Sequence, residues 1–121
     1  MLTGAIVTRG KFDFQYGKVE VRMKTNTRRG NFPAAWMKPS KNDPNKYGEI
    51  DIVEMFGDQG TAHQTIHNHL TATLKKRHPF TVNKKLAVNN WQVYGLEWSP
   101  DKLVLTIDGQ VTKAFQKSSN H

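Results

Sequence analysis

The chain has 121 residues and a mass of 13.8 kDa, enough for one domain that buries about two-thirds of its unfolded surface. It contains no cysteine, which excludes disulfides and thiolate metal sites, and no apolar run near the roughly 20 residues of a membrane-spanning helix. A formal charge of +8 favours acidic partners such as nucleic acid, anionic lipid or an acidic polysaccharide, or simply a well-solvated surface.

Short strand-like stretches follow one another along the chain, with no repeat or linker between them. Residues 16–24 alternate between apolar and charged side chains, which is typical of a half-buried strand. The apolar face is Val19, Val21 and Met23, and the charged face is Glu20, Arg22 and Lys24. Further strand candidates, separated by Gly, Pro, Asn and Asp, are residues 5–8, 34–37, 61–70 and 91–98. In the last of these, Trp91 and Trp98 stand at an odd separation and should face opposite ways.

The end of the chain has the pattern of a β-hairpin. Two strand-like runs, residues 103–107 and 110–115, flank the turn dipeptide Asp108-Gly109. No stretch competes as a long amphipathic helix. Roughly eight to ten short strands at regular spacing predict an all-β fold, an antiparallel jelly-roll sandwich.

Several basic residues stand in short groups within predicted loops or hairpin ends. These groups are Arg28-Arg29, Lys75-Lys76-Arg77 and Lys84-Lys85. Their spacing favours a solvated surface. A nucleic-acid-binding sheet is a minor alternative, because the chain has no recognisable single-strand-binding motif.

Three of the ten acidic residues fall within six positions of an apolar run, GEIDIVEMFG at residues 48–57. The β-branched residues and the flanking glycines favour a strand, in which Glu49 and Asp51 share one face and Glu54 points to the other. One β-bulge near Ile52-Val53 would return Glu54 to the face of the other two, and bulges are enriched beside active sites. The spacing therefore predicts a bulge and three carboxylates on one concave face.

Two carboxyl groups held close together suit the hydrolysis of a glycosidic bond with retention of configuration. Repulsion raises one pKa, so one group attacks the anomeric carbon as a carboxylate while the other keeps a proton for the leaving oxygen. Asp51, between them, can share a proton or hydrogen bond with the nucleophile. Two other interpretations stay open. One is an exposed strand face whose acids meet basic neighbours such as Arg22 or Lys24, and the other is a calcium or magnesium site.

The acidic run resembles the E-x-D-x-x-E signature of family 16 of the glycoside hydrolases, in the longer, bulged form of its laminarinase and agarase branches. The resemblance extends over nearly the whole chain in order and spacing. The matching stretches are TGAI at residues 3–6, GKF at 10–12, YGKVEVRMK at 16–24, FPAAWM at 32–37, YGLEWSP at 94–100 and DG at 108–109. It implies a concanavalin A-like jelly roll and an endo-acting hydrolase of β-glycans.

The resemblance also implies roles for individual residues. Glu49 matches the nucleophile, Asp51 the assisting acid and Glu54 the general acid/base. Trp36 matches an aromatic platform for a sugar ring, against the alternative of a core tryptophan. His67 lies on the strand expected beside the catalytic one and looks like a histidine that tunes the acid/base.

Other candidates rest on weaker signals. His63, His67 and His69 recur at even offsets, hence on one strand face, and a site role is less expected for the first and last. Arg22 is a candidate for orienting a carboxylate or a sugar hydroxyl, against a plain surface ion pair. Phe32 stands where many family members carry tryptophan, so it would form an altered edge of the substrate platform.

Family domains are usually about twice as long as this chain, so we expect residues 1–121 to be the central portion of one catalytic domain and the jelly roll to be incomplete. Unpaired sheet edges would then invite self-association or a complementing segment. No cofactor or metal is expected in this stretch, because the structural calcium usual in the family would bind mainly through segments outside it.

The sequence thus predicts an endo-acting, retaining hydrolase of β-1,3 or mixed β-1,3/1,4-glucan. The alternatives are a β-agarase or porphyranase acting on galactan, and a carbohydrate-binding jelly roll without turnover. The expected partner is a polysaccharide rather than nucleic acid or membrane. The first residues lack the pattern of a signal peptide, yet the resemblance implies an extracellular or periplasmic location.

Overall fold

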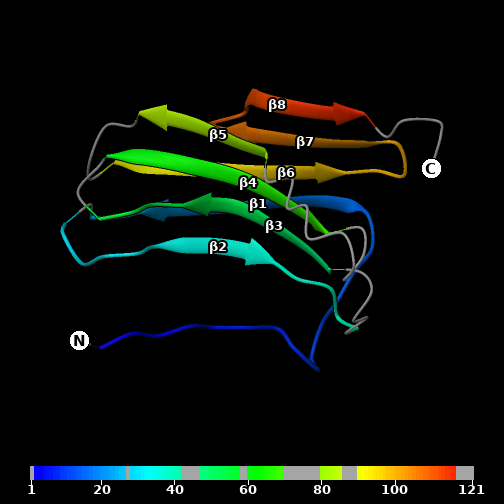
Figure 1. The fold of residues 1–121 in the computed structure, drawn as a ribbon, viewed down its shortest axis with the longest axis horizontal. Helices are drawn as coiled ribbons and strands as arrows, with labels where there is room; N and C mark the ends of the chain where they lie inside the picture. The colour runs from blue at the N-terminus through cyan, green and yellow to red at the C-terminus, as the bar shows by residue number, and fades with distance from the viewer. Residues whose placement is uncertain are drawn as a thin grey trace.

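The structure, a computed structural model, describes residues 2–26, 28–41, 47–57, 60–69, 80–85 and 90–116. These residues form eight strands in two antiparallel four-stranded sheets (Figure 1). One sheet has the order β1-β6-β7-β8 and the other the order β2-β3-β4-β5. The strands are β1 (Gly17–Lys24), β2 (Ala34–Met37), β3 (Tyr47–Glu54), β4 (Thr61–His69), β5 (Phe80–Lys85), β6 (Trp91–Trp98), β7 (Lys102–Ile107) and β8 (Gln110–Gln116).

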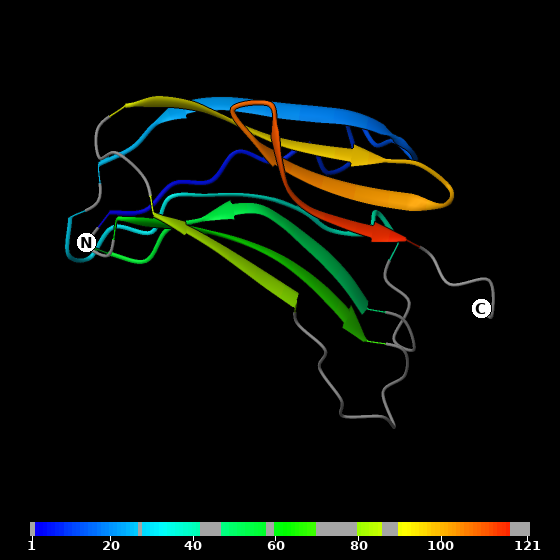
Figure 2. The ribbon, with the colours of Figure 1, turned by 90° about the horizontal axis from the view of Figure 1, so that it is seen from above.

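The two sheets lie over each other as two layers, so the molecule is the all-β jelly-roll sandwich that the strand pattern predicts (Figure 2). The described residues include no helix long and apolar enough to cross a membrane. A core fills the space between the layers, drawn from the inner faces of both sheets. Its fully buried members are Ile52, Val53, Met55, Ala62, Tyr94, Leu96, Leu105 and Ile107.

Alternation along β1 produces the face pattern expected from the sequence. Its apolar side chains are half-buried and pack toward the core, whereas Glu20, Arg22 and Lys24 are exposed. In β6, Trp98 packs against the core and Trp91 is 55% exposed, so the two tryptophans do face opposite ways. Both predictions are confirmed.

The predicted hairpin joins β7 to β8. Asp108 and Gly109 both have positive φ, 51° and 76°, which is the geometry of a type I′ turn and suits the twist of the flanking strands. Asp108 also fixes the turn to β6, because its backbone N donates to the Val93 carbonyl and its Oδ1 accepts from the Val93 N, both at 2.8 Å.

Two sequence-based expectations about strands need correction. Residues 5–8 form no strand, and Ile6 is fully exposed, because none of the strands in the described part of the chain pairs with this stretch. Conversely β5 was not expected, since its alternation is short and ends in Lys84-Lys85, a pair assigned to loops or hairpin ends. The basic group at 75–77 lies outside the described residues.

Each sheet ends in two edge strands, β1 and β8 in one and β2 and β5 in the other. Among the described residues each edge strand has one partner strand, so its other side presents backbone groups with which a further strand can pair. A complementing segment therefore stays a prediction.

Candidate active site

The acidic run forms β3, in the middle of the second sheet, and its ladder slips. Against β4, Asp51 pairs with Thr65 but Glu54 pairs with His63, so two residues of β3 lie opposite one of β4. Against β2, the register shifts between Ala35 and Trp36. The predicted bulge at Ile52-Val53 is therefore confirmed, and Glu54 returns to the face of Glu49 and Asp51.

Asp51 is the centre of the resulting cluster. Only 2% of its surface is exposed, and its Oδ2 lies 2.7 Å from His67 Nε2. The side chains of Asp51 and Glu54 also share a hydrogen bond. His67 reaches the cluster from β4, where it pairs directly with Glu49. His67 therefore lies on the strand next to the acidic one, as the sequence predicts.

Burial and proximity change how the cluster titrates. Burial, helped by the Asp51 charge and the hydrogen bond with Asp51, raises the pKa of Glu54 from an ordinary 4.5 to about 7. Burial also raises the pKa of Asp51, while its hydrogen bonds with His67 and Glu54 act in the opposite direction. The hydrogen bond between the two side chains lowers the pKa of Asp51 and raises that of Glu54, which is the direction expected when Glu54 donates and Asp51 accepts.

Glu49 occupies the more open end of the cluster. Its side chain is 19% exposed, and the Lys38 ammonium, just beyond β2, lies 3.8 Å from its Oε2. The Glu49 charge in turn contributes to raising the pKa of Asp51. Lys38 was not among the sequence-based candidates. It follows Met37 at the end of β2, and its position beside Glu49 depends on the β2–β3 register.

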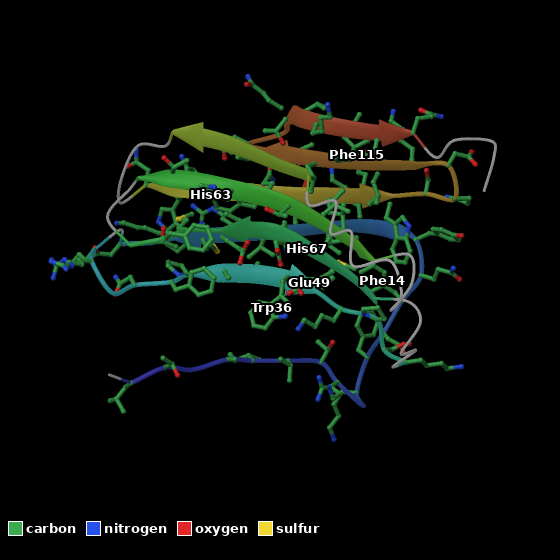
Figure 3. The ribbon with its side chains drawn as sticks, in the orientation of Figure 1. Phe14, Trp36, Glu49, His63, His67 and Phe115 are labelled. Atoms are coloured by element: carbon green, nitrogen blue, oxygen red, sulfur yellow. The ribbon has the colours of Figure 1, made fainter. Side chains whose placement is uncertain are left out.

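Aromatic side chains flank the carboxylates on the same face. Trp36 pairs with Asp51 across β2 and β3 and is 40% exposed, so it is no core residue. Figure 3 shows His67, Glu49 and Trp36 in a row across β4, β3 and β2. Beyond Glu54, Phe32 stacks on Phe56 with ring centroids 5.1 Å apart.

The other predicted candidates whose side chains the structure describes are not in contact with Asp51. His63 is on the same face of β4, edge-on to Phe56 at 4.9 Å, and its buried Nε2 has no hydrogen-bond partner. Arg22 lies on the exposed face of β1, in the other sheet, with its guanidinium 4.3 Å from the centre of the Trp91 ring. The structure does not bring Arg22 to the carboxylates. The side chain of His69 lies outside the described residues.

Sequence reasoning missed Phe56 and Gln64 as well as Lys38. Phe56 belongs to the apolar run of residues 48–57, yet it follows Glu54 by two positions and its ring contacts those of Phe32 and His63. Gln64 directly follows His63 in β4 and is fully buried, with hydrogen bonds to both sheets. No local sequence signal distinguishes it from an exposed strand glutamine.

In the described part of the chain, this cluster is the one group of three or more side chains that could hold a metal ion. One potential ligand atom from each of Asp51, Glu54 and His67 lies within 4.8 Å of the others. These atoms already satisfy one another by hydrogen bonds, which a metal would have to replace. The mixed nitrogen and oxygen donors would suit a transition metal better than calcium.

A comparison with protein families finds one family that matches nearly the whole chain. The model of glycosyl hydrolases family 16 matches residues 2–121. The chain belongs to glycosyl hydrolases family 16. A β-glucanase of Rhodothermus marinus is 32% identical over 121 residues, which cover 91% of this family 16 chain and 41% of that relative. A keratan-sulfate endo-1,4-β-galactosidase of Sphingobacterium multivorum is 28% identical, with 96% of this chain and 28% of the relative covered.

Solved structures of family 16 share the fold. The crystal structure of SCLam, a non-specific endo-β-1,3(4)-glucanase, superposes with a TM-score of 0.80 at 34% identity, over 93% of this chain and 43% of that one. The laminarinase from Rhodothermus marinus superposes with a TM-score of 0.77 at 29% identity, over 90% of this chain and 46% of that one. The chain therefore spans less than half the length of these relatives.

Proposed function

We propose that this chain carries the catalytic centre of an endo-acting, retaining hydrolase of β-1,3 or mixed β-1,3/1,4-glucan. One observation supports the proposal above all. The register slip in β3 gathers Glu49, Asp51 and Glu54 on one face, with Glu54 at a pKa of about 7. A retaining glycosidase needs this pairing of an ionised carboxylate with a protonated one.

In the first step, the Glu49 carboxylate attacks the anomeric carbon. The bond from that carbon to the leaving oxygen breaks, and Glu54 transfers its proton to this oxygen. In the second step, the ionised Glu54 takes a proton from water, whose oxygen attacks the anomeric carbon and releases Glu49. Glu54 is reprotonated for the next cycle, and its pKa of about 7 suits a group that must both donate and accept near neutrality.

Asp51 and His67 stabilise both protonation states of Glu54, the protonated one before the first step and the ionised one after it. Glu54 holds its proton partly because the ionised Asp51 accepts a hydrogen bond from it. Once this proton has left, negative charge on Glu49, Asp51 and Glu54 would be crowded at one place. His67 Nε2, at 2.7 Å from Asp51, can donate a hydrogen bond to Asp51 and reduce the repulsion.

The sheet face that carries the three acids suits a neutral polysaccharide. The half-exposed Trp36, opposite Asp51, offers a flat apolar surface on which a sugar ring can stack while its hydroxyls remain in water. Glucan is the proposed substrate because the similar β-glucanase and SCLam are both named for glucan cleavage. A polymer of this kind cannot cross a lipid bilayer, which agrees with a location outside the cytoplasm.

The test measures reducing ends released from laminarin, lichenan and agarose by the full-length protein and its Glu49→Ala variant. We expect the wild type to cleave the glucans and the variant to lose roughly 10⁴-fold or more in kcat. With an activated aryl glucoside, azide should restore turnover of Glu49→Ala and give the α-glycosyl azide, because it enters from the face that Glu49 occupied. Azide with Glu54→Ala should give the β-azide instead.

Each result discriminates between candidate functions. Cleavage of agarose but not of the glucans would favour the galactan hydrolase. Binding of laminarin without release of reducing ends by the wild type would favour a carbohydrate-binding module. Unchanged release by Glu49→Ala would refute the proposed nucleophile, and initial production of the α-anomer would refute retention.

A further inference from the structure

A glutamine lies buried directly behind the bulge of β3. Gln64 is the residue of β4 between Thr65, which pairs with Asp51, and His63, which pairs with Glu54. Two residues of β3, Ile52 and Val53, therefore lie opposite Gln64 alone. Because side chains alternate along a strand, Gln64 points away from the acids and into the space between the sheets, where it is 0% exposed.

The side-chain amide of Gln64 is fully used in this apolar surrounding. Its Nε2 donates to the Ile52 carbonyl and to the Thr106 carbonyl, each at 3.1 Å. Its Oε1 accepts from the Thr112 hydroxyl. The orientation of the amide is determined, since a flipped amide would face two carbonyl oxygens, which only accept, with an oxygen of its own.

The bulge supplies a reason for the first of these bonds. An extra residue in a strand disturbs the backbone ladder, and here it does so where Ile52 and Val53 are almost completely buried. A buried carbonyl without a donor is strongly unfavourable. The Gln64 amide satisfies the Ile52 carbonyl and so stabilises the slipped register over a regular one.

The other bonds join this bulge to a second one in the opposite sheet. In the β7–β8 ladder, Leu105 pairs with Lys113 but Thr106 pairs with Val111, so Thr112 is an extra residue of β8. Its hydroxyl lies within hydrogen-bond distance of both Gln64 Oε1 and the Leu105 carbonyl. Gln64 thus connects the irregular points of β3 and β8 through the core.

We propose that Gln64 is a positioning residue, whose amide fixes the register slip of β3 and thereby holds Glu54 beside Asp51 on the strand face that carries the acids. It touches neither substrate nor reacting atoms. The catalytic part of this inference rests on the proposed function. The part concerning register does not, so the two can fail separately.

The first test replaces the amide by a side chain of similar length in Gln64→Met. We expect kcat on laminarin to fall by about 10²-fold with little change in KM, because the acid is misplaced rather than the substrate. The alkaline limb of the pH profile should move to lower pH by about one unit as Glu54 separates from Asp51. Leu103→Ala is the control, since it removes core packing near the end of β7 away from Thr106, the residue that Gln64 contacts, and should lower stability without moving the pH profile.

Cross-strand proton contacts in NMR spectra give a readout that does not require activity. Contacts of Glu54 with His63 and of Asp51 with Thr65 report the slipped register, and we expect Gln64→Met to weaken or rearrange them. Retained contacts together with an unmoved pH profile would overturn the proposal. If the wild type cleaves no glucan, the proposed function fails, and these contacts alone decide whether Gln64 fixes the register.

A second pair of variants applies if Gln64→Met does not fold. Thr112→Val removes the partner of Gln64 Oε1 but leaves both donors to the carbonyls, whereas Thr112→Ser keeps the hydroxyl. We expect Val to reduce kcat by a few-fold and to shift the alkaline limb in the same direction, and Ser to restore both. Equal pH profiles for Val and Ser would contradict the connection to β8.

Discussion

Strands β1 and β3 both carry several charged side chains, and they hold them in opposite ways. In β1 the alternation is unbroken, so Glu20, Arg22 and Lys24 all face water. Lys18 Nζ lies 2.9 Å from Glu20 Oε1 there, with both side chains about half exposed. In β3 the alternation is broken by the bulge, and Asp51 is almost fully buried between two other acids.

The difference is one of surroundings rather than of residue type. An exposed ion pair contributes little, because water already stabilises both charges and salt screens them. A buried carboxyl loses that hydration, so its neighbours decide whether it keeps a proton, and the pKa of Glu54 rises to about 7. One extra residue in a strand therefore separates an exposed charged face from a buried cluster of carboxyl groups.

The largest expected difference between the two strands comes from replacing one glutamate in each. Glu54→Gln keeps size and hydrogen-bonding capacity but cannot transfer a proton, so kcat on laminarin should fall by about 10²–10⁴-fold. Glu20→Gln on β1 should change kcat by less than about twofold, since surface substitutions rarely disturb the fold. Initial rates of reducing-end release measure both. Equal losses in the two variants would contradict the distinction between the strands.

A smaller effect separates two histidines on one face of β4. His67→Ala removes the hydrogen bond to Asp51, a bond to a charged group, and should reduce kcat by roughly 10- to 100-fold. His63 has a buried Nε2 without a partner and contacts Phe56 by its ring edge. His63→Phe should therefore retain most activity and leave stability equal or higher, as judged by denaturant midpoints. A greater loss from His63→Phe than from His67→Ala would refute this assignment.

Local sequence determines much of this fold. The alternation in β1, the Asp108-Gly109 turn and the odd spacing of Trp91 and Trp98 each predict a feature that the structure contains. The bulge was also predictable, because Glu54 reaches the face of Glu49 only if one residue of β3 is extra. In all of these, the signal and the structure lie within one short stretch.

What the sequence does not reveal depends on register between distant strands. Lys38 meets Glu49, and Gln64 meets Thr106 and Thr112, only after separate strands pair and the sheets pack. Arg22 shows the opposite error. Its strand face was known to be polar, but alternation alone cannot say that the β1 sheet turns this face away from the acids.

Substitutions in the two strands should also differ in how they change the pH dependence of the free energy of unfolding. Because the pKa of Glu54 is about 7 in the folded chain and ordinarily 4.5, the folded state binds more protons than the unfolded state between these values. Stability should therefore fall as the pH rises through this window, and the raised pKa of Asp51 acts in the same direction. Urea unfolding at about pH 5 and about pH 8 should show this fall in wild type and Glu20→Gln, and a smaller one in Glu54→Gln. A fall of equal size in Glu54→Gln would mean that other groups cause it.

The smallest expected effect concerns the contact between Arg22 on β1 and Trp91 on the neighbouring strand β6. The guanidinium lies 4.3 Å from the centre of the ring, but Trp91 is 55% exposed, so the attraction competes with hydration. A double-mutant cycle with Arg22→Gln and Trp91→Leu should give a coupling of about 0.5–1 kcal/mol in unfolding free energy. Activity on laminarin should stay within about twofold for both variants, because this face lies in the other sheet. A tenfold rise in KM for Arg22→Gln would instead restore Arg22 as a substrate-binding residue, and would require the glucan to extend around the edge of the sandwich.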